Sequence, residues 1–217
     1  MQNKNSHSIE IFQRKRLRIL LLFAFALSGM TCFIYEVVWT RPLQLIFGST
    51  IYAVSAMLTT FMVGFVLGAF LFRNLADRSK NPALLFAGLE FGIGLYGLVI
   101  LSLFKVLPSI YLSFLGFPGF QFFQFVLAFL VLILPATFFG ATWPVVNRAY
   151  VNLSDMGKDV GRLYSFNSLG GVFGSLGAGF LLIPLLGIQN TSLFAASLNL
   201  LIAITIFTYA KKNSNQN

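Results

Sequence analysis

The chain has 217 residues, of which 57% are hydrophobic and only 10% are charged, and its mean hydropathy is +0.82. Soluble domains carry about 25% charged residues, so the composition excludes an ordinary water-soluble domain and indicates a membrane protein whose main partner is the lipid bilayer. The net charge of +9 does not indicate nucleic-acid binding, because the basic residues lie between apolar stretches. Cys32 is the one cysteine, so we expect no disulfide framework, no metal site and no cofactor.

Six apolar stretches follow one another along the chain. A helix that crosses about 30 Å of hydrocarbon needs roughly 20 apolar residues, and no stretch shows the two-residue alternation of a transmembrane barrel strand. The fold class is therefore predicted to be all-α, a polytopic membrane bundle of six transmembrane helices at 17–210, between a basic tail (1–16) and a short tail (211–217). The predicted spans are 17–38, 51–72, 83–104, 120–147, 162–184 and 190–210.

Basic residues are concentrated before the first span and in alternate connections. They are Lys4, Arg14, Lys15, Arg16 and Arg18, then Arg73, Arg78 and Lys80, then Arg148, Lys158 and Arg162, and finally Lys211 and Lys212. Of the 15 basic residues, only Arg41 and Lys105 fall in the other connections. Because cytoplasmic loops of membrane proteins are enriched in Lys and Arg, we predict a plasma (inner) membrane protein with both termini in the cytoplasm.

Residues 34–41, IYEVVWTR, are predicted to form the exit of the first span into the outer interface. Tyr35 and Trp39 suit the headgroup region, where an amphipathic ring is half in water. Arg41 is expected to reach water or lipid phosphate, while Glu36 faces the bundle.

Two of the six acidic residues, Glu36 and Glu90, fall within predicted spans. At about 1.5 Å per residue, Glu36 lies roughly 27 Å beyond Arg18, and Glu90 lies roughly 12 Å in from Pro82. These depths differ by about 15 Å, which excludes a pair of carboxylates acting together. Each acid either stabilises helix ends through an ion pair or contacts a cationic solute or a proton. Glu36, Glu90 and Arg41 are therefore the candidate substrate-binding residues.

Small residues recur at helical spacing in three of the spans. Helices associate in lipid through close packing of such residues, so these positions predict helix contacts. They are Gly64, Gly68, Gly94, Gly97, Gly170 and Gly174. Residues 92–97, GIGLYG, also match a dinucleotide-binding fingerprint, but they lie inside an apolar helical run and so indicate packing and no cofactor. The hydrophilic connection SDMGKDVGR, with Asp155, Lys158, Asp159 and Arg162, is predicted to be a solvated turn.

Four blocks resemble the membrane domain of the spermidine synthase-like membrane proteins, in the same order as in that family. They are IYEVVWTRPLQLIFGSTIYAVSAML, NLADRSKNP, GATWPVVNRAYV and VGRLYSFNSLGGVFGSLGAGFLLIPLLG. The family joins such helices to a cytoplasmic aminopropyltransferase domain, but only KKNSNQN follows the sixth span here. No position corresponds to the synthase's catalytic residues, so we expect no autonomous catalysis. The resemblance implies a membrane component that anchors a separately encoded soluble aminopropyltransferase or handles polyamine-like cations.

The chain also resembles a six-helix half of a major facilitator transporter. The segment GAFLFRNLADRSK is similar to the motif between the second and third helices of those carriers. This resemblance implies that Asp77 and Arg78 form a conformational latch, although a simple ion pair in the loop explains them equally well. A faint likeness between EVVWTRPL and TWPVVNRA, in the first and fourth spans, would fit an inverted repeat. The alternative functions are a homodimeric half-size transporter of a small solute and a purely structural membrane protein.

Overall fold

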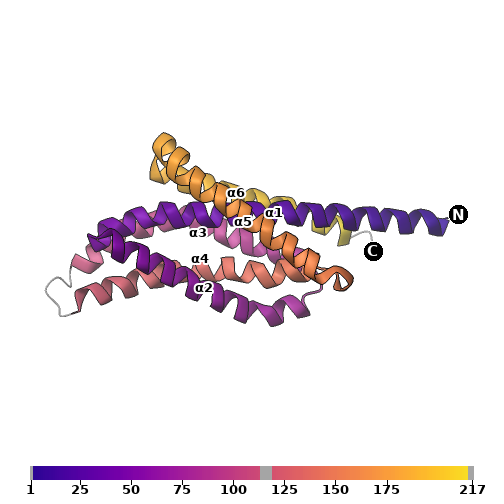
Figure 1. Cartoon of the computed structure of the whole chain (residues 1–217), viewed down its shortest axis with the longest axis horizontal. Coiled ribbons are helices and arrows are strands. Elements are labelled where there is room, and N and C mark those ends of the chain that lie inside the picture. The colour runs from indigo at the N-terminus through magenta and orange to yellow at the C-terminus, as the bar shows by residue number, and fades with distance from the viewer. Residues whose placement is uncertain (1, 113–118, 215–217) are drawn as a thin grey trace.

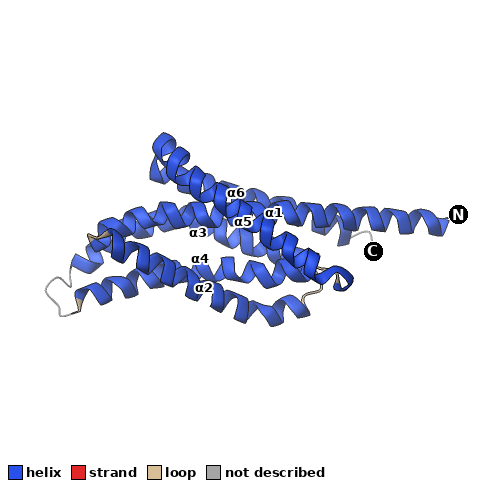
Figure 2. Ribbon diagram, viewed as in Figure 1, coloured by secondary structure: helices blue, strands red, loops and turns tan. Residues whose placement is uncertain are grey.

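The computed structural model describes residues 2–112 and 119–214, with side chains for 15–110 and 119–212. Every regular element in this part is helical (Figure 2). The helices are α1 (Gln2–Phe47), α2 (Thr50–Arg78), α3 (Pro82–Leu112), α4 (Phe120–Tyr150), α5 (Met156–Gly177) and α6 (Ile183–Ser214), with a 3-10 turn, η1 (Leu153–Asp155), and a π-helical turn, η2 (Ala178–Leu182). The side chains of Lys4 and Arg14 lie outside the described residues.

Helix ends coincide with residues that favour a change of backbone direction. Gly48 has φ 64° just after α1, and its amide donates to the carbonyl of Gln44, which is the left-handed end common after helices. Asn81 accepts from the amide of Leu84 at 3.3 Å, and Pro82 begins α3, where its missing N–H costs little. The α1–α2 and α2–α3 connections are therefore short.

The last helical stretch, Leu153–Lys212, is 60 residues long and contains both the fifth and the sixth predicted spans. Within it, Gly187 has φ 77° and ψ 171°, which no helix accommodates. Figure 1 shows that the chain turns back after α5, so that α6 returns along the bundle. The first turns of α1, the last turns of α6 and the α2–α3 and α4–α5 connections gather at one end of the bundle in that view.

Five helical stretches in the described part are long and apolar enough to cross a membrane. They are Lys15–Phe47, Thr50–Arg78, Pro82–Ile110, Phe120–Tyr150 and Leu153–Lys212. These stretches confirm the all-α architecture and indicate a multi-pass membrane protein.

The most extensive helix contacts pair α2 with α4, α1 with α5, and α3 with α6. Glycines lie at each of these contacts. A Cβ on Gly68 would overlap the backbone of α4, and a Cβ on Gly170 would overlap the carbonyl oxygen of Ala26 in α1. A Cβ on Gly94 would come within 2.8 Å of Leu200 in α6. Since only glycine allows such close approach, these residues fix the spacing between the helix backbones.

The same holds for the remaining predicted packing positions. A Cβ on Gly64 would overlap Ala136 of α4, and a Cβ on Gly174 would overlap the carbonyl oxygen of Met30. Gly97 is covered by the Tyr35 ring.

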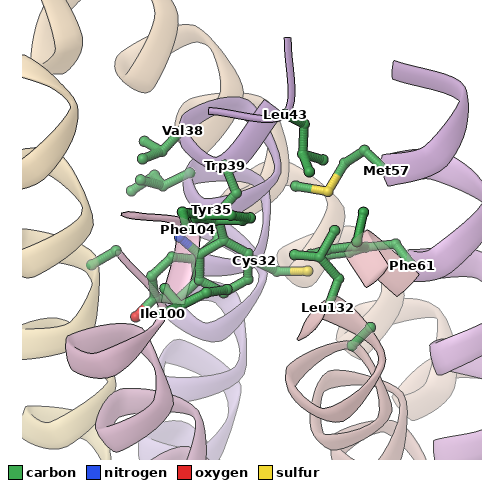
Figure 3. Close-up of a cluster of buried hydrophobic side chains, with 14 of the residues drawn as sticks. Cys32, Tyr35, Val38, Trp39, Leu43, Met57, Phe61, Ile100, Phe104 and Leu132 are labelled. Carbon is green, nitrogen blue, oxygen red and sulfur yellow. The ribbon is translucent and has the colours of Figure 1, made fainter. Parts of the chain in front are cut away.

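The buried side chains form two apolar clusters, one toward each end of the bundle. The first contains Tyr35, Trp39, Phe61 and Leu132 (Figure 3). The second contains Leu21, Phe25, Phe86, Val145 and Leu163.

The predicted interfacial position of Tyr35 and Trp39 is wrong. Both side chains are 0% exposed, their rings stack at 4.4 Å between centroids, and Trp39 Nε1 lies 3.4 Å from Ser192 Oγ. The physical reason is the length of α1, which continues through Pro42 to Phe47. Residues 34–41 thus lie two turns inside the helix and contribute to its packed face.

Candidate functional site

A group of polar side chains lies where the two apolar clusters meet. In α3, Leu89 belongs to one cluster and Ile93 to the other, and Glu90 lies between them. Asn199 has the same position in α6, between Ala195 and Ile202. Three helices thus bring polar groups to the middle of the bundle, because α1 contributes Ser28 and Thr31 between Phe25 and Cys32.

Asn199 connects the three helices through its side-chain amide. Its Nδ2 donates to Glu90 Oε2 at 2.7 Å and to Thr31 Oγ1 at 3.0 Å, which uses both amide hydrogens. The Thr31 hydroxyl donates to the Ser28 carbonyl oxygen at 2.9 Å, so its oxygen is available to accept. The Ser28 hydroxyl also faces the Glu90 carboxylate. Glu90, Asn199 and Thr31 are all 0% exposed.

Three buried polar atoms at this centre have no hydrogen-bond partner among the described residues. They are Glu90 Oε1, Asn199 Oδ1 and Tyr35 Oη. Glu90 also forms no ion pair within the part of the chain that the structure describes. An isolated carboxylate is costly to bury, so this centre suits a proton or a small cation that would neutralise it. We call Ser28, Thr31, Tyr35, Glu90 and Asn199 the Glu90 centre.

A cavity of about 390 Å³ adjoins the Glu90 centre, between α1, α2, α4 and α5. Five aromatic side chains line it: Phe25, Phe33, Phe65, Phe139 and Trp143. Ser28 lines this cavity and also faces Glu90, so it belongs to both. The cavity is large enough for a small organic molecule, and its rings suit an apolar or cationic one.

No protein family, curated protein or solved structure matches the chain.

The predicted site residues do not all come together. Glu36 is half-buried in α1, Arg41 is exposed one turn further along, and Glu90 is fully buried in α3. Glu36 and Arg41 form no ion pair with each other or with any other described side chain. Of the three candidate substrate-binding residues, Glu90 alone lies within a network of described polar side chains.

The predicted latch residues lie at the end of α2. Asp77 and Arg78 are both exposed, and neither forms an ion pair or a side-chain hydrogen bond within the described ranges. Their role as a latch stays a prediction.

A different ion pair closes that end of the bundle. The Arg18 guanidinium in α1 binds the carboxylate of Asp159 in α5. Asp159 Oδ2 also accepts from the backbone N–H of Asn152 at 3.0 Å. Arg18 lies over the Tyr150 ring at 4.7 Å from its centroid. Asp159 is 1% exposed, so its assignment to a solvated turn is wrong. The physical reason is that α5 begins at Met156, which turns Asp159 toward α1 in the first helical turn.

Asn199 was missed because a single amide in an apolar span carries little weight by itself. The signal was present, since SLNLLIA places Asn199 as the one amide within an otherwise apolar run. Polar side chains inside lipid need partners, which would have suggested that Asn199 meets Glu90.

Proposed function

We propose that the chain is a carrier-like membrane protein that binds a proton or a small cation at Glu90. The observation that carries this proposal is the fully buried Glu90 carboxylate, held by the neutral donor Asn199 and with Oε1 unpartnered among the described residues. A purely structural acid would be expected to meet a basic side chain, as Asp159 does. Intramembrane acids of this kind mark ion or proton pathways.

Six crossings are part of this proposal. A straight helix of 60 residues would be about 90 Å long, three times the thickness of a bilayer core. The turn at Gly187 divides Leu153–Lys212 into two segments, and each is long enough to cross by itself. An even number of crossings fits the shared end of α1 and α6 (Figure 1) and the basic residues at that end.

The helix pairing supports an inverted repeat of three helices. In such a repeat the first three helices correspond to the last three: α1 to α4, α2 to α5 and α3 to α6. This exchange turns the α1–α5 pair into the α4–α2 pair. The same exchange leaves the α3–α6 pair unchanged and turns α1–α6 into α4–α3, and all of these pairs are in contact. Inverted repeats of this type occur in carriers whose binding sites lie near the middle of the membrane. This pairing favours the transporter-like alternative over a purely structural protein.

Liposomes that contain the purified protein would test the proposal. We expect labelled spermidine uptake, or proton flux reported by an entrapped pH dye, to fall at least about tenfold in Glu90→Gln, because the amide cannot carry a negative charge. Glu36→Gln is the matched control, since Glu36 is another acid in a span but lies outside the Glu90 centre. Unchanged transport in Glu90→Gln would make that acid structural, and loss in Glu36→Gln alone would move the site to that end of α1.

Resemblance to the spermidine synthase-like membrane proteins supports a second candidate, an anchor for a soluble aminopropyltransferase. The block VGRLYSFNSLGGVFGSLGAG supplies Gly170 and Gly174, which pack α5 against α1. Affinity purification in mild detergent tests this candidate. Co-purification of an aminopropyltransferase supports it, and a preparation that contains only this chain counts against it.

A homodimer would complete the transporter-like alternative. The aromatic cavity lies on the face formed by α1, α2, α4 and α5, where Val66 is 68% exposed beside it. A second copy on this face would enclose the cavity. We expect a short bismaleimide to cross-link Val66→Cys in a Cys32→Ala background, but not Val99→Cys, which is 52% exposed on α3. Equal cross-linking at both positions would contradict this arrangement.

A further inference from the structure

A second groove, apart from the Glu90 centre, lies between α1 and α6 near the shared end of these helices. Its volume is about 530 Å³. Arg16 and Lys212 lie at its charged end, and Ile19 and Phe23 form part of its apolar wall. Ile19 is 50% exposed and Phe23 is 56% exposed, so the wall faces the surroundings of the bundle.

The groove changes from charged to apolar along its length. Phe23 follows Arg16 by seven residues in α1, and Thr205 precedes Lys212 by seven residues in α6, so the lining extends for about 10 Å along both helices. Two basic side chains on antiparallel helices thus lie at one end, and the apolar side chains of α1 lie further along the groove.

The polar groups that line the groove favour an anion. None of its lining residues is acidic. The hydroxyls of Thr205 and Thr208 donate to carbonyl oxygens within α6, at 2.7 and 2.9 Å, so no negatively charged group lies beside the two basic side chains in the lining. The charge at this end is therefore complementary to a phosphate.

We propose that this groove binds an anionic phospholipid. Its phosphate lies between Arg16 and Lys212, and one acyl chain lies along Ile19, Leu20 and Phe23. Basic pockets between membrane helices recognise lipid headgroups through this combination of charge and apolar wall. A free phosphate would use the charged end alone and would leave the apolar wall without a role. The groove is independent of Glu90, so it stands or falls separately from the proposed transport function.

The test compares phosphatidylglycerol with phosphatidylcholine on the purified full-length protein. Native mass spectrometry counts bound lipid, and a thermal melt in detergent measures the stabilisation that each lipid gives. Each basic side chain near an anionic headgroup strengthens binding roughly fivefold. We therefore expect phosphatidylglycerol affinity to fall about 25-fold in the double variant Arg16→Gln, Lys212→Gln.

Lys211→Gln is the matched control. Lys211 is one residue away on the same helix, but it lies over the Phe207 ring, 5.7 Å from the ring centroid, and does not line the groove. We expect this variant to change affinity less than about twofold, because it removes one charge outside the site.

Three results would overturn the proposal. The first is equal phosphatidylglycerol binding by the double variant and the native chain. The second is an equal loss in Lys211→Gln, which would mean attraction to surface charge in general. The third is stabilisation by inorganic phosphate that matches the lipid, which would assign the site to a free anion.

Discussion

Among the described residues two acidic side chains are buried, and they differ in whether a basic side chain pairs with them. Asp159 meets Arg18 and accepts from the Asn152 amide, so its charge is paired. Glu90 meets Asn199, which is neutral, and its Oε1 has no partner in the described part of the chain. Both carboxylates are at most 1% exposed, so burial alone does not separate them.

The difference shows that a buried carboxylate can stabilise the fold or stay available to bind a ligand. A paired acid fixes two elements relative to each other, and breaking the pair leaves an uncompensated charge. An acid that lacks a basic partner remains available to a proton or a cation, and its neutral neighbours orient it without removing that capacity. We therefore expect Asp159 to matter for stability and Glu90 for transport.

The largest effect is expected from Asp159→Ala. It leaves Arg18 and the Asn152 amide without their acceptor, so we predict a loss of about 2–3 kcal/mol in the free energy of unfolding. That is below the range for a fully buried pair, because the Arg18 side chain is 34% exposed. Unfolding in detergent, followed by circular dichroism, measures it.

Asp155→Ala is the control for this change. Asp155 pairs with Lys158 at 3.8 Å, but both side chains are more than half exposed, so we expect less than about 0.5 kcal/mol. Equal losses in the two variants would remove the distinction between a buried and a solvated acid in this connection.

The next effect tests the helix contact that brings Asp159 to Arg18. Gly170→Ala places a methyl group against the carbonyl oxygen of Ala26, so α5 must shift away from α1. Overpacking of this kind costs about 1–3 kcal/mol. Gly177→Ala adds the same methyl group where nothing lies within 4 Å, and we expect its thermal midpoint to stay within about 2 °C of the native value. Alanine favours a helix more than glycine does, so a similar loss in both variants would mean that the contact with Ala26 does not determine the result.

The apolar runs predicted the helices well because lipid imposes one simple rule on composition. All six predicted spans fall within helical segments, and the chain reverses at Gly187, between the last two predicted spans. The C-terminal end of α1 was not predicted, because the helix continues through Thr40, Arg41 and Pro42 to Phe47. That extension is why Tyr35 and Trp39 are buried and not interfacial.

The two buried acids show which features of the site could not be predicted from the sequence. Glu90 stood out because charge is rare in a span. Asp159 did not stand out, because the sequence of a polar connection does not indicate which of its side chains is buried. Its partner Arg18 lies 141 residues earlier, so only the packing of α5 on α1 reveals the pair.

Glu90→Gln is expected to leave stability almost unchanged, in contrast to Asp159→Ala. A glutamine keeps an oxygen that accepts from Asn199 and removes the burial of a charge, so we predict a change within about 1 kcal/mol in unfolding free energy. The same preparation would be measured for transport, where the variant is expected to fail. A loss of several kcal/mol would place Glu90 with Asp159 as a structural acid.

The smallest effect is expected from Ser28→Ala, which sharpens the comparison because Ser28 belongs to both the Glu90 centre and the aromatic cavity. Its hydroxyl faces a carboxylate that Asn199 already holds, so the loss in stability should be about 0.6 kcal/mol, typical of a hydrogen bond between membrane helices.

If the cavity and Glu90 act together, Ser28→Ala should also weaken the apparent affinity for a transported cation by about threefold to tenfold while the maximal rate is kept. Thr142→Val is the control, since Thr142 also lines the cavity but its hydroxyl donates to the Phe139 carbonyl oxygen within α4. An affinity change confined to Ser28→Ala would tie the cavity to the unpaired acid. Equal changes in the two variants would show instead that the cavity responds to any loss of polarity, and Glu90 would then act without it.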